Sequence, residues 1–294
     1  MAFLIAFVMA LNTRIAPLPP LGKFLDPFQG FWANARQADQ YEMLVKTGVL
    51  ANSVRVLYDD MLVPHLFAEN EPDLYRAAGF VHAMHRLWQM EIQTHAAGGR
   101  LSEIVGDLTL NMDRAQRRKG MVYGAENFIR HLDDTSRMIL EAYTQGVNTY
   151  ISQLDYADFP MEYKLLDYTP EPWSELKSGL LYKYMSDMLN SFERDLENTN
   201  FLSIYGRDML DLIYPNVDNS QDPVVDNPSW DFEPLKKNNS SMTSGGTITG
   251  LEPLSTHNHN NGSNNWAVSR ERSATGNAML ANDMHLNLYM PSLW

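Results

Sequence analysis

Residues 260–269 read NNGSNNWAVS, and from Ser263 onward polar and apolar residues alternate in the pattern of a β-strand. A second strand-like run, NAMLANDMHL (277–286), follows the polar residues RERSATG (270–276). Two such runs joined by a turn that ends in glycine predict a β-hairpin. Because a two-stranded sheet is marginally stable alone, we expect this hairpin to be the front of a longer β region, which begins abruptly at Ser263.

The residues before the hairpin have a different composition. Residues 236–262 read KKNNSSMTSGGTITGLEPLSTHNHNNG, a stretch rich in Asn, Ser, Thr and Gly with few apolar residues to anchor it in a core. This composition is typical of an exposed linker, and we assign residues 237–262 to a spacer. No third histidine or acidic residue is placed to join His257 and His259 as a ligand, which favours ordinary linker residues over a metal site.

The junction between spacer and hairpin has a chemical consequence. Cleavage of the Gly262–Ser263 bond would give Ser263 a free α-amine beside its hydroxyl. A serine hydroxyl needs a base within reach, and an α-amine, with a pKa of about 7.7 to 8.0, is partly unprotonated near neutral pH. One residue would then supply both nucleophile and base. Gly-Ser pairs are common in loops, so the dipeptide alone does not establish this chemistry.

Upstream of the spacer the first structured pattern is a pair of short strands. Residues 54–67 contain two β-branched and aromatic runs around an acidic break at Asp59 and Asp60. Pro64 cannot donate a backbone hydrogen bond, so we expect the second strand to lie at a sheet edge.

Helical periodicity follows these strands. Apolar residues recur three and four apart from residue 73 to Gly98-Gly99, and again over residues 135–154. Asp133, Asp134 or Thr135 is expected to cap the second of these helices. Ser174 is expected to cap one long helix, or two, towards Gly206. The chain shows no internal repeat, which argues against a solenoid.

The chain starts with eleven consecutive apolar residues, Met1 to Leu11. This run is shorter than the about 20 residues that span a bilayer and has the length of the apolar part of a signal peptide, although a basic start and a small-residue cleavage site are missing. We expect residues 1–20 to form a signal or membrane anchor and a proline-rich connector, and the protein to be exported or periplasmic. The alternative is a helix buried in the fold.

The bulk composition narrows the classes of partner. With 44% hydrophobic and 20% charged residues, the 294-residue chain can build a sizeable core. A formal net charge of -13 repels a phosphate backbone and argues against nucleic acid as a partner. The absence of cysteine excludes disulfides, thiol catalysis and thiolate-bound zinc.

Four blocks together resemble the penicillin acylase (penicillin amidase) family of N-terminal-nucleophile hydrolases. They are VPHLFAENEPDLYRAAGFVHAMHRLWQMEIQTHAAGGRLSEIVGD (63–107), YKLLDYTPEPW (163–173), GSNNWAVS (262–269) and GNAMLANDMHL (276–286). The resemblance extends from about residue 54 to 294 and keeps the order of the blocks. It implies a precursor that cuts itself into an α chain, a discarded spacer and a β chain that starts with the catalytic serine.

For the fold, the resemblance implies the α+β class, with the αββα sandwich of these hydrolases. The chain would hold the mainly helical α-chain region (21–236), the spacer and the start of the β chain (263–294). The two mature chains would form a heterodimer.

For the site, the resemblance makes Ser263 the nucleophile and Gly262–Ser263 the bond that is cut. His285 would contact the serine amine or hydroxyl and tune its protonation; a structural histidine is the alternative. Asn282 and Asp283 are expected to hold a turn, in which Met284 replaces the proline usual in the family.

The family often binds calcium, which is the one cofactor expected. Asp195 matches the α-chain ligand best, with Glu197 as the alternative; both could equally be an ordinary solvated helix face. Calcium takes six to eight oxygen ligands, so one carboxylate cannot form the site alone. Met185, Met188 and Leu189 correspond to a region that lines the acyl pocket in relatives, although such residues on a helix can also be plain core.

The chain departs from the family pattern at two positions near the helical block. His85 replaces the usual aspartate before RLWQME, and Leu62 replaces the usual glycine before Val63, so we expect that turn to differ. The neighbours Arg86, Trp88, Gln89 and Glu91 are assigned to the scaffold.

The activity implied is hydrolysis of an acyl amide in a penicillin-like or N-acyl homoserine lactone-like substrate. The oxyanion-hole donors of relatives would fall after Trp294. The alternative is a truncated, inactive relative that serves as a binding or structural module. A helical domain without catalysis would require the resemblance to be accidental.

Overall fold

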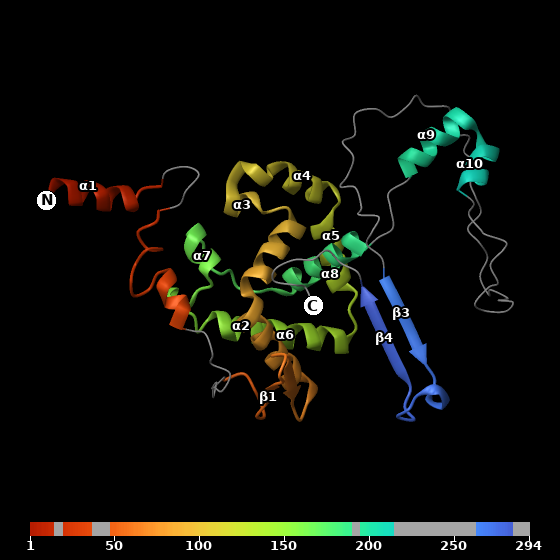
Figure 1. Cartoon of the computed structure of the whole chain (residues 1–294), viewed down its shortest axis with the longest axis horizontal. Helices are drawn as coiled ribbons and strands as arrows, with labels where there is room; N and C mark the ends of the chain where they lie inside the picture. The colour runs from red at the N-terminus through yellow and green to blue at the C-terminus, as the bar shows by residue number, and fades with distance from the viewer. Residues whose placement is uncertain (15–19, 37–47, 190–194, 215–262, 285–294) are drawn as a thin grey trace. The chain divides into compact units, whose positions relative to one another are not determined.

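The computed structural model describes residues 1–14, 20–36, 48–189, 195–214 and 263–284 (Figure 1). The chain divides into two units, Met1–Asn190 and Ser191–Trp294, which are described separately. The spacer 237–262 and His285 lie outside the described residues.

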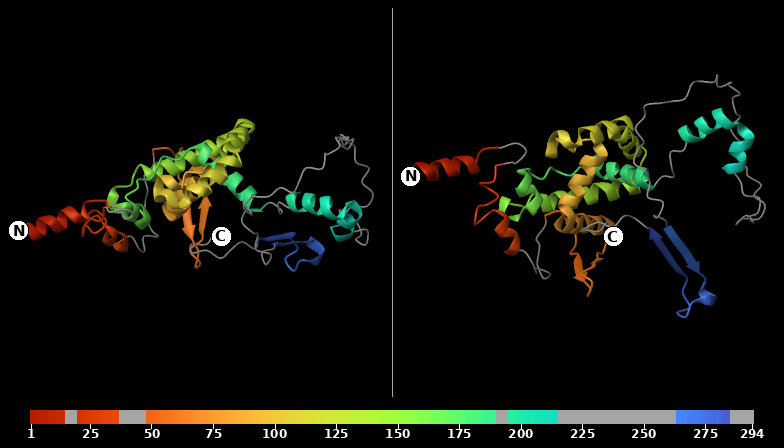
Figure 2. Two further views of the ribbon diagram at one scale, coloured as in Figure 1. Left: turned by 90° about the horizontal axis from the view of Figure 1, so that it is seen from above. Right: turned by 45° about the horizontal axis from the view of Figure 1, so that its top comes forward.

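Helices α2 (Glu71–Gly98) and α6 (Asp134–Ile151) form the centre of the first unit. Figure 2 shows from two further directions that the helices from α2 to α8 lie in one bundle. The other elements of the bundle are α3 (Ser102–Val105), η2 (Gly106–Thr109), α4 (Leu110–Arg118), α5 (Met121–Arg130), η3 (Tyr156–Asp158), α7 (Met161–Leu166) and α8 (Glu175–Leu189). The apolar core is built from Ala83, Leu87, Met90, Val147, Tyr163 and Trp173.

The ends of α2 follow from its sequence. The Asn70 side chain accepts a hydrogen bond from the Asp73 amide at 2.8 Å and caps the start. Gly99 takes a left-handed conformation, with φ of 65°, and ends the helix where the glycine pair predicted. Arg86 has non-helical angles (φ −138°, ψ 20°), so the helix is kinked there.

Two other predicted caps are confirmed. Asp133 is the residue that caps α6, and its carboxylate accepts a hydrogen bond from the Ser136 amide at 2.7 Å. The Ser174 hydroxyl accepts one from the Lys177 amide at 3.4 Å at the start of α8. Each cap satisfies a backbone donor that the helix itself leaves free.

A small antiparallel sheet precedes α2. Strand β1 (Arg55–Tyr58) pairs with β2 (Pro64–Phe67), which confirms the predicted strand pair. In the turn, the Asp59 carboxylate accepts hydrogen bonds from the Met61 and Val63 amides, both at 2.9 Å. Leu62 has a φ of 60° and thus adopts the conformation that glycine favours, which strains a side chain with a Cβ.

The first helix, α1 (Ala2–Leu11), contains no buried residue. The two interpretations of this segment, a signal or anchor and a helix buried in the fold, both stay predictions. Residues 20–36, which include η1 (Phe31–Arg36), lie against the bundle through Asn34, whose side chain donates to the Phe159 carbonyl at 2.9 Å. Among the described residues, every helix is too short or too polar to span a bilayer.

In the second unit the structure describes residues 195–214 and 263–284, which form two helices and a hairpin. Helices α9 (Asp195–Tyr205) and α10 (Arg207–Ile213) are separated by Gly206, whose φ is 80°. Between Ser174 and Gly206 the structure describes two helices, α8 and α9, with residues 190–194 outside the described residues. Strands β3 (Ser263–Val268) and β4 (Met279–Met284) pair antiparallel as predicted, and η4 (Arg270–Arg272) lies in their connection.

The close contact of α2 with α6 depends on two glycines. A Cβ added at Gly146 would overlap the backbone carbonyl of Arg76, and one at Gly79 would overlap that of Tyr143. Larger residues would have to push the two helix backbones apart, because a carbonyl in a helix cannot rotate away.

We predict that Gly146→Ala lowers the free energy of unfolding by about 1–3 kcal/mol, the usual range for overpacking. The matched control is Gly124→Ala in α5, where an added Cβ meets only the Lys183 side chain at 3.6 Å or more. That variant should gain about 0.5–1 kcal/mol from the better helix propensity of alanine. Equal effects of the two substitutions in chemical denaturation would contradict the close-contact interpretation.

Candidate functional site

The β3–β4 hairpin carries the predicted nucleophile. Ser263 is the first residue of β3, and its cross-strand partner is Met284, the last residue of β4. Ser263 is exposed. His285 follows Met284 in the chain and lies outside the described residues, so its proposed contact with the serine stays a prediction.

The prediction of a turn at residues 282–284 is wrong. Asn282 pairs with Asn265, and Asp283 pairs with Asn264, so both lie inside β4. Met284, which stands where the family usually has proline, is also part of the strand, because it pairs with Ser263.

The register decides which side chains share a face with the nucleophile. Successive residues of a strand point to opposite faces, and directly opposed residues share one. Ser263 therefore shares its face with Asn265 and with their partners Met284 and Asn282. The serine thus has an apolar side chain, Met284, directly opposite it and two amide side chains, Asn265 and Asn282, next along the same face.

The predicted calcium ligands begin helix α9. Asp195 is its first residue, and its side chain is outside what the structure describes. Glu197 is exposed. Met185, Met188 and Leu189, the predicted acyl-pocket residues, lie in the last turn of α8; both methionines are half-buried and Leu189 is exposed. Calcium binding and the pocket both remain predictions.

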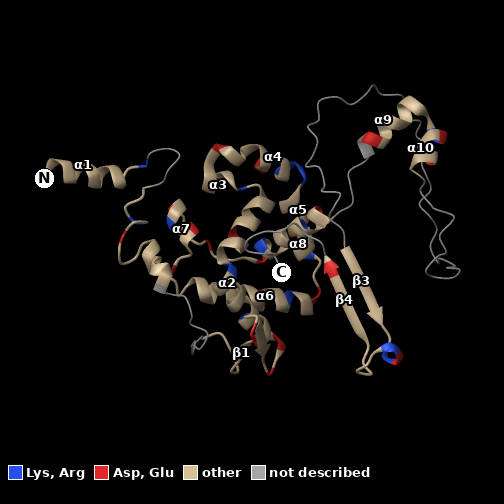
Figure 3. Cartoon of the chain, viewed as in Figure 1, with Lys and Arg blue, Asp and Glu red and all other residues tan. Residues whose placement is uncertain are grey.

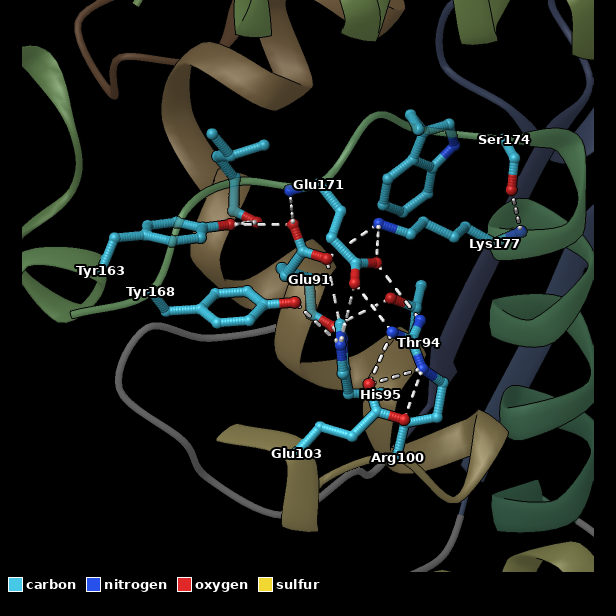
Figure 4. A network of polar contacts seen from close by, with 12 residues as sticks. Glu91, Thr94, His95, Arg100, Glu103, Tyr163, Tyr168, Glu171, Ser174 and Lys177 are labelled. Atoms are coloured by element: carbon cyan, nitrogen blue, oxygen red, sulfur yellow. Dashed lines mark hydrogen bonds and ion pairs between the residues drawn. The ribbon is translucent and has the colours of Figure 1, made fainter. Parts of the chain in front are cut away.

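Two blocks that carry the family resemblance meet in a buried polar cluster, drawn in Figure 4. We call it the Glu91 network and define it as Glu91, His95, Arg100, Tyr163, Tyr168, Glu171 and Lys177. The first three come from α2 and the residues after it, the next three from α7 and the YTPEPW segment, and Lys177 from α8. The network thus joins elements that lie far apart in sequence.

Lysine and arginine neutralise the two carboxylates of this network. The Lys177 ammonium is 2.8 Å from Glu91 Oε1 and 3.1 Å from Glu171 Oε2. Arg100 donates from two nitrogens to Glu171, at 2.7 and 3.2 Å. Because the Glu91 side chain is only 1% exposed, its charge needs these donors to offset the loss of hydration.

The remaining acceptor of Glu91 and the ring of His95 are also satisfied. Glu91 Oε2 accepts from the Tyr163 hydroxyl at 3.2 Å and from the Glu171 amide at 3.1 Å. His95 Nδ1 lies 3.0 Å from the Glu91 carbonyl, which can only accept, so Nδ1 carries a proton. In the neutral ring, Nε2 then accepts from the Tyr168 hydroxyl at 3.1 Å.

Ligand atoms of Glu91, His95 and Glu171 lie within 4.8 Å of one another, as they would around a metal ion; no other such trio occurs among the described residues. The Lys177 ammonium already contacts both carboxylates, so the protein itself supplies the cation. The assignment of Glu91 to the scaffold agrees with this arrangement. Sequence reasoning missed the network, although Glu91 and His95, spaced i, i+4 on the same helix, are a visible signal.

His85, the second departure from the family pattern, lies beside the α2 kink. Its Nε2 is 2.7 Å from the Tyr58 hydroxyl of β1, and the two rings meet edge to face. Burial lowers the pKa of His85, and the nearby charge of Arg86 lowers it further. The residue therefore connects the first hairpin to α2.

We predict that Lys177→Met lowers the free energy of unfolding of the helical unit by about 3–5 kcal/mol, because it leaves the buried Glu91 carboxylate without its closest cation. The matched control is Lys183→Met on the same helix, where the ammonium lies over the Phe128 and Tyr182 rings. That change should cost about 1 kcal/mol or less. Similar losses for both variants in urea unfolding would show that the Glu91 network does not depend on Lys177.

The network also predicts a pH dependence. Hydrogen bonds from Arg100, with a further contribution from Lys177, lower the pKa of Glu171 from 4.5 to about 2. A folded-state pKa below the unfolded value contributes stability that is present above about pH 4.5 and is lost as the pH falls towards 2. The free energy of unfolding of Glu171→Gln should therefore fall less steeply with decreasing pH over this window. The difference in slope from wild type should correspond to the uptake of up to about one proton on unfolding. Parallel acid-unfolding curves for wild type and variant would contradict this role.

Comparison with known proteins agrees with the family resemblance of the four sequence blocks and with the fold. The family model described as Penicillin amidase matches residues 53–294. The chain is 32% identical over 248 residues to the Penicillin acylase 2 proenzyme of Pseudomonas sp. (strain SE83), which covers 83% of this chain and 32% of that protein. It is 29% identical over 279 residues to the acyl-homoserine lactone acylase QuiP of Pseudomonas aeruginosa, which covers 90% of this chain and 31% of that protein.

The chain spans about a third of the length of these curated relatives. Among solved structures, it is similar to a thermostable penicillin G acylase from Alcaligenes faecalis, with a TM-score of 0.50 and 23% identity over 60% of this chain and 98% of that one. At this identity the likeness concerns the fold, and it confirms the predicted α+β class. With the family model covering residues 53–294, the chain belongs to the penicillin amidase family.

Proposed function

We propose that this chain is the N-terminal part of an acylase that uses Ser263 as its nucleophile after the Gly262–Ser263 bond has been cut. One observation carries the proposal: Ser263 is the first residue of β3 within a family match that extends across the junction. The word proenzyme in the name of one relative supports a precursor that is processed.

Self-cleavage would begin with the Ser263 hydroxyl attacking the Gly262 carbonyl. The amide nitrogen leaves as the free amine, and water then hydrolyses the ester. Glycine at position 262 suits this step because it tolerates the backbone conformations that a rearranging bond requires. The products are an α chain and a β chain, which form a heterodimer.

In the mature enzyme, the α-amine of Ser263 takes the proton from its own hydroxyl as the oxygen attacks the substrate amide carbonyl. The proton passes to the leaving amine, and an acyl-serine ester remains. Water then releases the acid and restores the serine. An amine with a pKa of about 7.7 to 8.0 suits this exchange near neutral pH.

The remaining site residues complete the proposal. His285 would tune the protonation of the Ser263 amine, and Met185, Met188 and Leu189 would contact the acyl group. Asp195, or Glu197, would supply one oxygen ligand to a structural calcium. Its carboxylate suits a hard cation, whereas the other ligands would have to come from elsewhere in the protein.

The relatives suggest two substrates for the test. One is named a penicillin acylase, and several are named acyl-homoserine lactone acylases. Both names describe removal of an acyl group from an amide nitrogen. We propose that the substrate is a small N-acyl amide of one of these two kinds and that the enzyme acts after export from the cytoplasm.

We predict that the wild-type gene product separates into two polypeptides, one of which starts at Ser263, and that Ser263→Ala stays as one chain without acylase activity. The residual rate should be lower by at least about 10³-fold, because both the nucleophile and its base are affected. Ser269→Ala, in the same hairpin, is the matched control and should be cut and active. Mass spectrometry with N-terminal sequencing, and release of the acid from both kinds of amide, provide the measurements.

Measurable amide hydrolysis by an uncut wild-type chain, at the same rate as by Ser263→Ala, would contradict the proposed nucleophile. A folded wild-type product that is uncut and inactive would favour the alternative, a binding or structural module.

A further inference from the structure

We propose that α1 inserts part-way into a lipid bilayer and that the exposed aromatic residues of segment 20–36 lie at the bilayer surface. This inference goes beyond the acylase chemistry and does not depend on it. The ligand is a membrane surface, recognised by its hydrocarbon and its headgroups.

Helix α1 is apolar on every face. Residues Ala2–Leu11 are only Ala, Phe, Leu, Ile, Val and Met, and none of them is buried. Phe3 is 85% exposed and Met9 is 66% exposed. Figure 3 shows no charged residue along the helix. A helix that is hydrophobic all round requires an apolar environment on all sides.

This uniform apolar surface favours lipid over a protein groove. A helix that docks in a groove presents one apolar stripe and keeps a polar face in water. At about 1.5 Å per residue, the ten residues of α1 measure about 15 Å, half of the about 30 Å hydrocarbon core of a bilayer. The helix therefore fits within one leaflet and does not cross.

The C-terminal end of α1 suits the boundary between hydrocarbon and headgroups. The Asn12 side chain donates to the Val8 carbonyl at 2.9 Å, and the Thr13 hydroxyl donates to the Met9 carbonyl at 2.7 Å. These bonds pair the two polar side chains with carbonyls of the last helical turn, which lowers the cost of removing this end from water. Arg14 follows directly and is exposed, so its charge can reach a lipid phosphate.

Segment 20–36 adds exposed aromatic residues. Phe28 is 73% exposed and Trp32 is 57% exposed. Trp is enriched where a membrane protein meets the interface, because its ring is both apolar and a hydrogen-bond donor. The segment therefore presents a second apolar contact in addition to α1.

A buried lysine fixes this segment to the folded bundle. Lys164 of α7 is 1% exposed, and its ammonium donates to the Gly30 carbonyl at 3.1 Å, to Asn34 Oδ1 at 2.8 Å and to the Ala157 carbonyl at 2.8 Å. The buried Lys164 ammonium is thus bound by neutral oxygens of the segment, from Gly30 and Asn34, and of the bundle, from Ala157. Membrane binding by Trp32 would therefore hold the helical bundle at the surface.

The overall charge indicates which force drives binding. A net charge of -13 opposes approach to an anionic surface, whereas Arg14 and Lys23 provide only local positive charge. Burial of apolar side chains must therefore dominate, and we expect binding to neutral vesicles that changes little with salt.

The test uses the purified gene product in flotation with vesicles of phosphatidylcholine alone and with added phosphatidylglycerol. The wild type should float with both. The double substitution Phe3→Asp with Phe7→Asp should lower the bound fraction by at least about tenfold, because charge on the apolar helix opposes insertion. The single substitution Trp32→Ser should lower the bound fraction several-fold, a smaller loss than that of the double substitution.

The matched control is Leu108→Asp, which changes a residue that is 89% exposed on η2 of the bundle and should float as the wild type does. Ser263→Ala should also float, so a failure of the acylase proposal leaves this test unaffected.

Three outcomes would overturn the inference: a wild type that stays out of the floating fraction, a Phe3→Asp, Phe7→Asp variant that floats unchanged, or a mature N-terminus found after residue 20. Binding of α1 to a protein in the absence of vesicle binding would also overturn it.

Discussion

The helical unit depends on neutralising one buried carboxylate. Glu91 is removed from water at the centre of the bundle, and an isolated charge there would destabilise the fold. Lys177, the Tyr163 hydroxyl and the Glu171 amide approach it from α8, α7 and the YTPEPW segment. Because each donor comes from a different element, the charge of Glu91 selects one arrangement of these elements over others. Packing alone would allow more freedom, since apolar contacts are not directional.

The proposed nucleophile has a different physical setting. Ser263 needs a chain end and an open face, and the β3–β4 hairpin provides a strand that starts at this residue. An exposed Ser263 and a buried, neutralised Glu91 are thus provided by two different parts of the chain. The network joins several elements of the bundle, whereas the hairpin leaves Ser263 exposed. The proposed membrane contact through α1 is a third property, carried by a separate segment.

Local features could be predicted because they depend on neighbours in the sequence. The cap at Asp133, the end of α2 at Gly99 and both hairpins follow from periodicity and turn residues. The Glu91 network could not be predicted in this way, since Glu91 and Lys177 are 86 positions apart and meet only when α2 packs against α8. The turn expected at Asn282 and Asp283 was wrong because cross-strand pairing with Asn264 and Asn265 overrides their turn propensity.

Local sequence patterns were enough to predict the long helices α2 and α6, both hairpins, the family and the residue at which the second hairpin starts, because backbone hydrogen bonding and face periodicity act over a few residues. The tertiary structure decided which buried charges neutralise each other, which glycines allow α2 and α6 to touch, and that α1 remains exposed. Those outcomes depend on several elements packing at once, and packing fixes distances between residues that no local pattern connects.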